Sequence, residues 1–150
     1  MKESNKISEI ISEYPASEIQ KQFWMINNFH PDSPAYNIAS VFRITGELDR
    51  EALQCSLNDI VRRHESLRTF FRLVNGDVAG IISGPAPVEI AETDLTDRAG
   101  EKAGKEAESI ISDLVNRPFK LDEYPLYRNS LIRVSSGEHY LVLVVHHIII

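Results

Sequence analysis

The positions of apolar residues along the chain predict three helices. Ser17 can cap the first helix and Gln20 can complete a capping box, and the apolar face then carries Ile19, Phe23 and Ile26. Asp49 can cap the second helix, whose apolar side carries Leu53, Leu57, Ile60, Val61 and His64. The third helix is expected to begin near Asp97 and to end before Pro118, with Ala103, Ala107, Ile110, Ile111 and Leu114 at helical spacing.

Shorter apolar runs between these helices are typical of strands. Ile38, Phe42 and Ile44 share one face of a predicted strand, and Gly46 then turns the chain. Two further runs flank Asn75-Gly76-Asp77, which favours a hairpin because asparagine and glycine tolerate positive φ. The sequence therefore predicts two antiparallel strands on either side of this turn.

The last part of the chain predicts a second hairpin. Residues 126–134 and 139–150 are joined by a short polar segment that contains Gly137. The stretch from Leu141 to Ile150 lacks polar alternation, so we expect a strand that is buried on both faces. Together these elements predict an α+β fold in which helices pack on a mixed, mainly antiparallel sheet.

Composition and charge exclude several classes of function. The chain has 150 residues, 43% hydrophobic and 25% charged, which suits one globular domain. A formal net charge of −6, with Arg62-Arg63 as the longest basic cluster, argues against a nucleic-acid partner. The first 15 residues contain acidic side chains and no continuous apolar stretch, and no segment reaches membrane-spanning length, so we expect a cytoplasmic protein. Cys55, the single cysteine, is expected to be a small buried side chain.

Two clusters of residues that could take part in binding or catalysis have simple structural interpretations. Phe23 and Trp24 follow helical spacing, which is more typical of packing than of ligand binding. His64 lies on the apolar side of the second predicted helix. Arg63 and Arg68 lie near the end of that helix, where cations interact favourably with the helix dipole, so an ion-pair cluster is expected.

The third cluster is the histidine pair His146-His147 near the end of the chain. Adjacent residues of a regular strand point to opposite faces, so these two side chains cannot enter one pocket or chelate one metal ion. At most one of them is expected to act on a given side of the sheet. No metal site is predicted.

These three clusters contain short motifs that occur in a definite order. They read SEIQKQFW at residues 17–24, RHESLRTFF at residues 63–71 and HHIII at residues 146–150. Together they resemble three core motifs of the condensation domains of nonribosomal peptide synthetases, usually written SxAQxRLW, RHExLRTxF and HHxxxDG. The second motif matches at every specified position.

The other two motifs depart from the family pattern. Ile19 replaces the alanine and Gln22 replaces the arginine of the first motif, while the aspartate and glycine of the third would follow Ile150. Similarity also extends through PDSPAYNI, GELD and RPFKLDEYPLYRNSLIR, so the resemblance covers most of the chain.

The resemblance implies a fold as well as a function. The fold would be one half of a chloramphenicol-acetyltransferase-like pseudodimer, a V-shaped molecule with a channel between its arms. Residues 1–13 would form a lead-in, and residues 14–150 would form the amino-terminal subdomain, ending inside the third motif.

The implied activity is amide bond formation between two thioesters that carrier proteins present on 4′-phosphopantetheine arms. No cofactor would be bound directly. Donor and acceptor carrier proteins and the carboxy-terminal subdomain would be the partners, with neither nucleic acid nor membrane involved.

The resemblance also assigns roles to individual residues. It implies that His147 is the principal active-site residue and that His146 has a supporting role. Arg63 would pair with the aspartate of the third motif, and Arg68, His64 and Glu65 would support the site structurally.

An amine that attacks a thioester must lose a proton. A neutral imidazole, with an ordinary pKa near 6.5, can accept that proton at cellular pH. His147 could instead orient the amine or stabilise the tetrahedral charge, because a thiol is already a good leaving group. The sequence leaves these roles open.

Other functions on the same fold remain as alternatives. One is a starter domain that joins a fatty acyl group to the first amino acid. Another is an epimerisation domain, which would share the histidine motif, although the match of RHESLRTFF favours condensation. A further alternative is a non-catalytic half-domain that self-associates or binds a carrier protein. The 150 residues by themselves are expected to be inactive, because one arm supplies only half of a channel.

Overall fold

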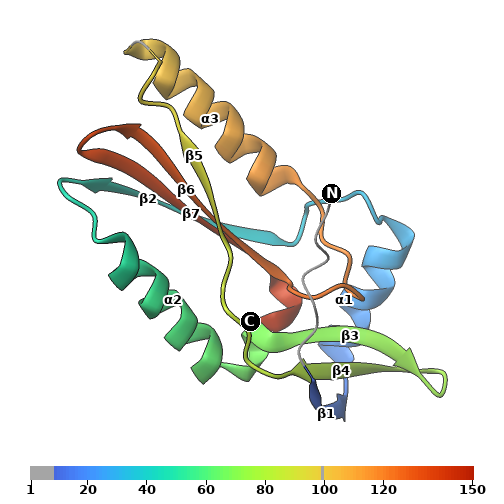
Figure 1. Cartoon of the computed structure of the whole chain (residues 1–150). Coiled ribbons are helices and arrows are strands. Elements are labelled where there is room, and N and C mark those ends of the chain that lie inside the picture. Colours follow the sequence, from blue (N-terminus) through green and yellow to red (C-terminus); the bar gives the residue numbers. More distant parts are fainter. Residues whose placement is uncertain (1–8, 99) are drawn as a thin grey trace.

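A computed structural model describes residues 9–98 and 100–150 of the chain (Figure 1). Its secondary structure consists, in chain order, of β1 (Ile10–Pro15), α1 (Glu18–Phe29), β2 (Asn37–Thr45), α2 (Arg50–Arg63), the 3-10 turn η1 (Glu65–Arg68), β3 (Thr69–Val74), β4 (Asp77–Ser83), β5 (Ile90–Asp94), α3 (Glu101–Asn116), β6 (Tyr127–Ser135), β7 (Glu138–His146) and the 3-10 turn η2 (His147–Ile149). The predicted α+β class is confirmed.

The larger sheet has four strands in the order β2-β7-β6-β5 and lies between two helices. β7 pairs antiparallel with both β2 and β6, while β5 runs parallel to β6. Val142 and Val144 of β7 belong to the same core cluster as residues of α3, whereas Leu143 and Val145 pack with residues of α2. The alternation along β7 thus buries both of its faces, as predicted, and α3 and α2 cover opposite sides of the sheet (Figure 1).

The smaller sheet contains three antiparallel strands in the order β1-β4-β3. Asn75 and Gly76 both have positive φ, 52° and 90°, which confirms the predicted turn between β3 and β4. The expectation of a single sheet is wrong, because this hairpin pairs with β1 instead of joining the larger sheet. β1 includes Ile10 to Glu13, which fall in the expected lead-in, whereas residues 1–8 of that lead-in lie outside the described part.

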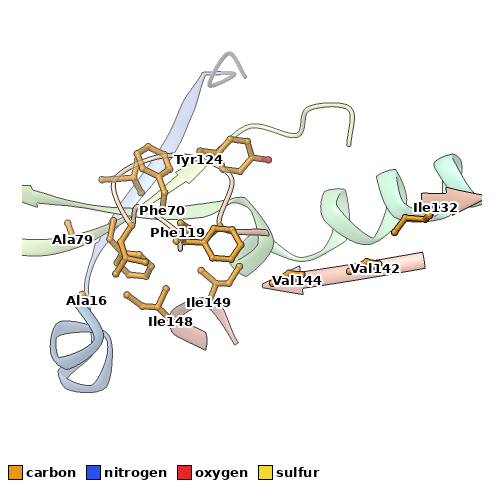
Figure 2. Packing of buried hydrophobic residues seen from close by; sticks show 14 of the residues in the cluster. Ala16, Phe70, Ala79, Phe119, Tyr124, Ile132, Val142, Val144, Ile148 and Ile149 are labelled. Carbon is orange, nitrogen blue, oxygen red and sulfur yellow. The ribbon is translucent and has the colours of Figure 1, made fainter. Parts of the chain in front are cut away.

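The main hydrophobic core joins the two sheets (Figure 2). Phe70 of β3 is fully buried and shares this core with Phe119, which precedes β6. Ile148 and Ile149 of η2 lie in the same cluster and are only 2% and 4% exposed. Ile148 and Ile149, which follow the histidine pair, therefore anchor the chain between the sheets.

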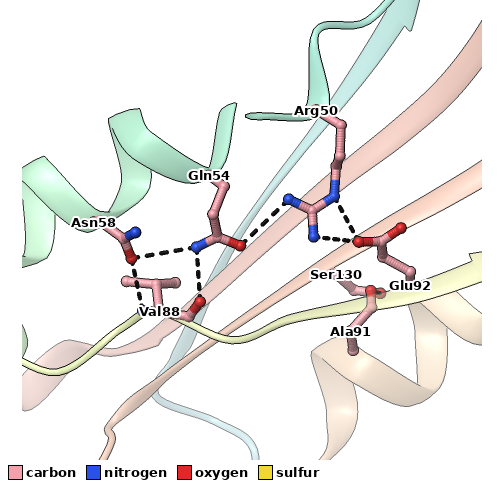
Figure 3. A network of polar contacts seen from close by, with 7 residues as sticks. All are labelled: Arg50, Gln54, Asn58, Val88, Ala91, Glu92 and Ser130. Carbon is pink, nitrogen blue, oxygen red and sulfur yellow. Dashed lines mark hydrogen bonds and ion pairs between the residues drawn. The ribbon is translucent and has the colours of Figure 1, made fainter. Parts of the chain in front are cut away.

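A polar network along α2 holds the edge strand β5 (Figure 3). Asn58 accepts the N–H of Val88 at 2.8 Å, and Gln54 Nε2 donates to the Val88 carbonyl, also at 2.8 Å. Arg50, one turn earlier, donates to Gln54 Oε1 and pairs with Glu92 of β5. Because these three residues are spaced i, i+4 and i+8, they lie on one side of α2. There they bind the extended segment that contains Val88 and Glu92.

Several local expectations are corrected by the structure. The predicted strand from Leu141 to Ile150 ends at His146, because the chain turns into η2. The third helix begins at Glu101 and not near Asp97, since Gly100 before it has a positive φ of 44°. Cys55 is exposed on α2, so its expected burial is wrong.

The predicted buried face of the first helix is also only partly right. Ser17 and Gln20 form the expected capping box. Phe23 is half-buried, but Ile19 and Ile26 are 65% and 37% exposed. The inward side of α1 instead carries Gln20 and Asn27, which donate to carbonyl groups of other segments.

Candidate active site

The histidine pair lies where β7 ends and η2 begins. The N–H of His146 donates to the Leu126 carbonyl at 3.0 Å, and the N–H of His147 donates to the Tyr36 carbonyl at 2.9 Å. His146 Nδ1 accepts the N–H of Ile148 at 3.1 Å, so its ring caps the turn that follows. These bonds hold the backbone of both histidines.

His146 is a buried structural residue. It is 3% exposed, and its ring packs edge to face with Phe23 and Phe119, with ring centroids 6.3 and 6.2 Å apart. Burial, and secondarily the charge of His147, lowers the pKa of His146 to about 4. A neutral ring with Nδ1 accepting carries its proton on Nε2, which makes His146 a fixed support at pH 7.

His147 is exposed and held from one side. Phe23 of α1 stacks on its ring, with centroids 5.2 Å apart and an interplanar angle of 28°. Tyr36 meets Phe23 edge to face at 4.8 Å, so the aromatic support is itself fixed. An exposed imidazole with a fixed backbone and one covered face can accept a proton or orient a substrate.

The two histidines belong to different elements. The prediction of a regular strand through both residues is wrong, because His147 already belongs to η2. The two rings nevertheless differ in exposure, since His146 is buried and His147 is exposed. Among residues 9–98 and 100–150, no group of three or more His, Cys, Asp or Glu side chains could hold a metal ion.

Arg68, in the second motif, is a buried structural residue. It is 5% exposed, and its guanidinium donates to the carbonyl groups of Val61 and Ser83. Glu65 lies 3.9 Å away, but its side chain is 65% exposed, so this ion pair adds little. Arg68 therefore ties the end of α2 to β4.

The first three residues of the second motif face solvent. Arg63, His64 and Glu65 are exposed, and His64 caps α2 through its backbone, so its expected place on the apolar side is wrong. In the part of the chain that the structure describes, no hydrogen bond or ion pair connects these three side chains to the histidine pair. The expected ion-pair cluster is thus reduced to the weak Arg68–Glu65 contact.

Sequence reasoning missed polar residues that surround the histidines. Asn37 begins β2 opposite His146 and donates to two carbonyl groups near the end of α3. Arg128 of β6 donates to three carbonyl groups of the same region and lies over the Phe119 ring. Both residues fall in stretches whose resemblance to the family was noted, but no spacing rule indicates such long-range contacts.

Comparison with known proteins identifies the family of this site. The family model described as "Condensation domain" matches residues 10–150. The chain belongs to the condensation domain family. The predicted membership is confirmed.

Named relatives of this condensation domain chain are much longer than the chain itself. It is 38% identical over 135 residues to chondramide synthase cmdD of Chondromyces crocatus, covering 90% of this chain and 4% of the relative. It is 40% identical over 136 residues to surfactin synthase subunit 2 of Bacillus subtilis (strain 168), covering 91% of this chain and 4% of the relative. The chain thus spans only a small part of each of these proteins.

A solved structure confirms the fold of the amino-terminal half of a condensation domain. The starter condensation domain of the rhizomide synthetase RzmA matches with a TM-score of 0.83 and 26% identity, covering 91% of this chain and 34% of that chain. None of the helices among the described residues is long and apolar enough to cross a membrane.

Proposed function

We propose that this chain forms the amino-terminal part of a condensation domain that joins two carrier-bound thioesters through an amide bond. The observation that carries the proposal is the histidine pair, in which an exposed His147 stacked on Phe23 directly follows a buried, neutral His146. The relatives, which are named as synthases of chondramide and surfactin, support it.

In the proposed reaction, the amine of the acceptor attacks the thioester carbonyl of the donor. The new C–N bond forms, the C–S bond breaks, and the thiol leaves with the proton that the amine loses. His147 either accepts that proton or orients the amine, and His146 keeps the backbone of the turn in place.

The substrates are proposed to arrive on 4′-phosphopantetheine arms of donor and acceptor carrier proteins in the cytoplasm. A related starter condensation domain, with 26% identity and a TM-score of 0.81, was solved in complex with C8-CoA, whose pantetheine portion is chemically similar to such an arm. No directly bound cofactor, nucleic acid or membrane takes part in this proposal.

Downstream residues are proposed to complete the site. Arg63, at the end of α2, is exposed and has no ion-pair partner among the described residues. It is therefore able to pair with the aspartate of the third motif.

On one face of the edge strand β2, Ile38 and Phe42 are 38% and 51% exposed. Such an apolar surface is typical of an interface, here with the rest of the domain or with a second copy of the chain.

The test is turnover by a full-length condensation domain whose first 150 residues are this chain. His147→Ala should abolish or greatly reduce amide product in a single turnover with both carriers loaded, while folding and carrier binding persist. His30→Ala, which removes another exposed histidine, is the matched control and should keep activity. Undiminished product from His147→Ala would refute the assignment.

A starter function is the second candidate, because the solved neighbours include starter condensation domains. The same full-length domain should be offered an acyl-CoA and a carrier-bound acyl donor in separate reactions. Product from acyl-CoA with a carrier-bound amino acid would favour the starter role, whereas product only from two loaded carriers would favour elongation.

A further inference from the structure

Four carbonyl groups at the end of α3 are held by side chains from two strands. Asn37 Nδ2 donates to Val115 and Arg117 at 2.7 and 2.8 Å. Arg128 donates to the carbonyl groups of Leu114, Arg117 and Pro118 at 3.0, 2.6 and 3.1 Å. We name Asn37 and Arg128 the α3 clamp, because the last carbonyl groups of a helix have no partners inside it.

The α3 clamp lies next to the backbone that holds His147. Asn37 directly follows Tyr36, whose carbonyl accepts the N–H of His147. Asn37 also stands opposite His146 in the pairing of β2 with β7. Any shift of Asn37 relative to α3 therefore changes the position of the Tyr36 carbonyl.

The second clamp residue acts through an aromatic ring. The guanidinium carbon of Arg128 lies 3.7 Å from the centre of the Phe119 ring, and that ring meets His146 edge to face at an angle of 85°. Asn27 of α1 donates to the Phe119 carbonyl at 3.3 Å. The segment after α3 thus packs directly against the buried histidine.

We propose that Asn37 and Arg128 are positioning residues, which hold the turn that carries His147 in the position that the reaction requires. This inference rests on the proposed function for the part that concerns turnover. Neither side chain is proposed to touch substrate.

The chemistry of the two side chains fits this role. Both Nδ2 protons of Asn37 are used on carbonyl groups, so an aspartate at this position would lose both bonds and place a negative charge against two carbonyl dipoles. Burial, and secondarily the charge of Arg117, lowers the pKa of Arg128 to about 10, which leaves it charged at pH 7. A cation at the carboxyl end of a helix is favourable.

The exchange rate of the His147 amide measures how firmly the α3 clamp holds this backbone, independently of turnover. In the full-length domain that begins with this chain, Asn37→Asp and Arg128→Met should raise the exchange rate of the His147 amide by about tenfold or more through local opening. The amide of Val61, inside α2 and 4% exposed, is the reference for global unfolding and should keep its rate.

Turnover is the second readout. Two more conservative variants are included in case the first two do not fold. In both variants kcat should fall while KM for the loaded carriers stays unchanged, as expected for a loss of positioning. Asn37→Ala and Arg128→Lys should give smaller changes in the same direction. Arg43→Met, at an exposed ion pair with Glu138 on the same sheet, is the matched control and should change neither readout.

Each outcome decides the proposal. Unchanged exchange at His147 in all four variants overturns it, and so does an equal rise at His147 and Val61, which would indicate a purely structural role. Faster exchange at His147 with unchanged kcat also overturns the positioning role. If His147→Ala keeps full activity while the clamp variants open the turn, the proposed function fails and the clamp geometry stands.

Discussion

Arg68 and Arg63 belong to the same motif, but we expect losses of stability of very different size when they are replaced. The sequence suggested that both matter for folding. Arg68 is 5% exposed and donates to two carbonyl groups, whereas Arg63 is exposed at the end of α2. Replacement by methionine removes the guanidinium in each case and keeps a side chain of similar length.

The magnitude for Arg68→Met follows from the carbonyl groups that it leaves behind. Each buried acceptor without a partner costs about 1–3 kcal/mol, so the loss at Val61 and Ser83 amounts to roughly 2–6 kcal/mol. For a domain of this size, that corresponds to a fall in melting temperature on the order of 10 °C. Arg63→Met loses only a favourable interaction with the helix dipole, about 0.3–1 kcal/mol.

Urea unfolding of the 150-residue chain at pH 7, followed by Trp24 fluorescence and by circular dichroism, measures both differences. Coincident transitions by the two probes are needed for a two-state free energy. A cost below about 1 kcal/mol for Arg68→Met would refute the assignment of its hydrogen bonds as stabilising. An equal cost for the two variants would show that the exposed position of Arg63 is wrong.

Three further predictions concern other parts of the chain. The pKa of His146 is lowered to about 4, so the unfolded state binds the proton more readily than the folded state. The stability that this group contributes is complete above about pH 6.5 and is lost as the pH falls through about 4. His146→Asn should remove that part of the pH dependence of unfolding. Ser17→Ala should cost about 1 kcal/mol in the same assay because α1 loses its capping box, whereas an equal loss in Ser17→Asp would contradict the cap. Cys55 is exposed, so a thiol reagent should modify it in the native state, and a requirement for denaturant would show that it is buried.

The candidate site was predicted only where a motif carries its own signal. The histidine pair and the second motif were found from their sequence and family resemblance. Residues near His147 come from distant parts of the chain, such as Phe23 and Tyr36, and only the fold shows that they meet. Asn37 and Arg128 act on carbonyl groups 78–80 and 10–14 residues away, which is a distance that no local pattern encodes.

Local chemistry let the sequence determine the caps of α1 and α2, the Asn75-Gly76 turn, the end of α3 before Pro118 and the central strand β7. These features depend on neighbouring residues or on a continuous apolar run. The tertiary structure decided where β7 stops, since Ile148 and Ile149 are needed in the core between the sheets and the chain must turn to bury them. It also divided the charged residues of the second motif into buried Arg68 and exposed Arg63, because burial depends on what packs against a side chain and not on its place in a motif.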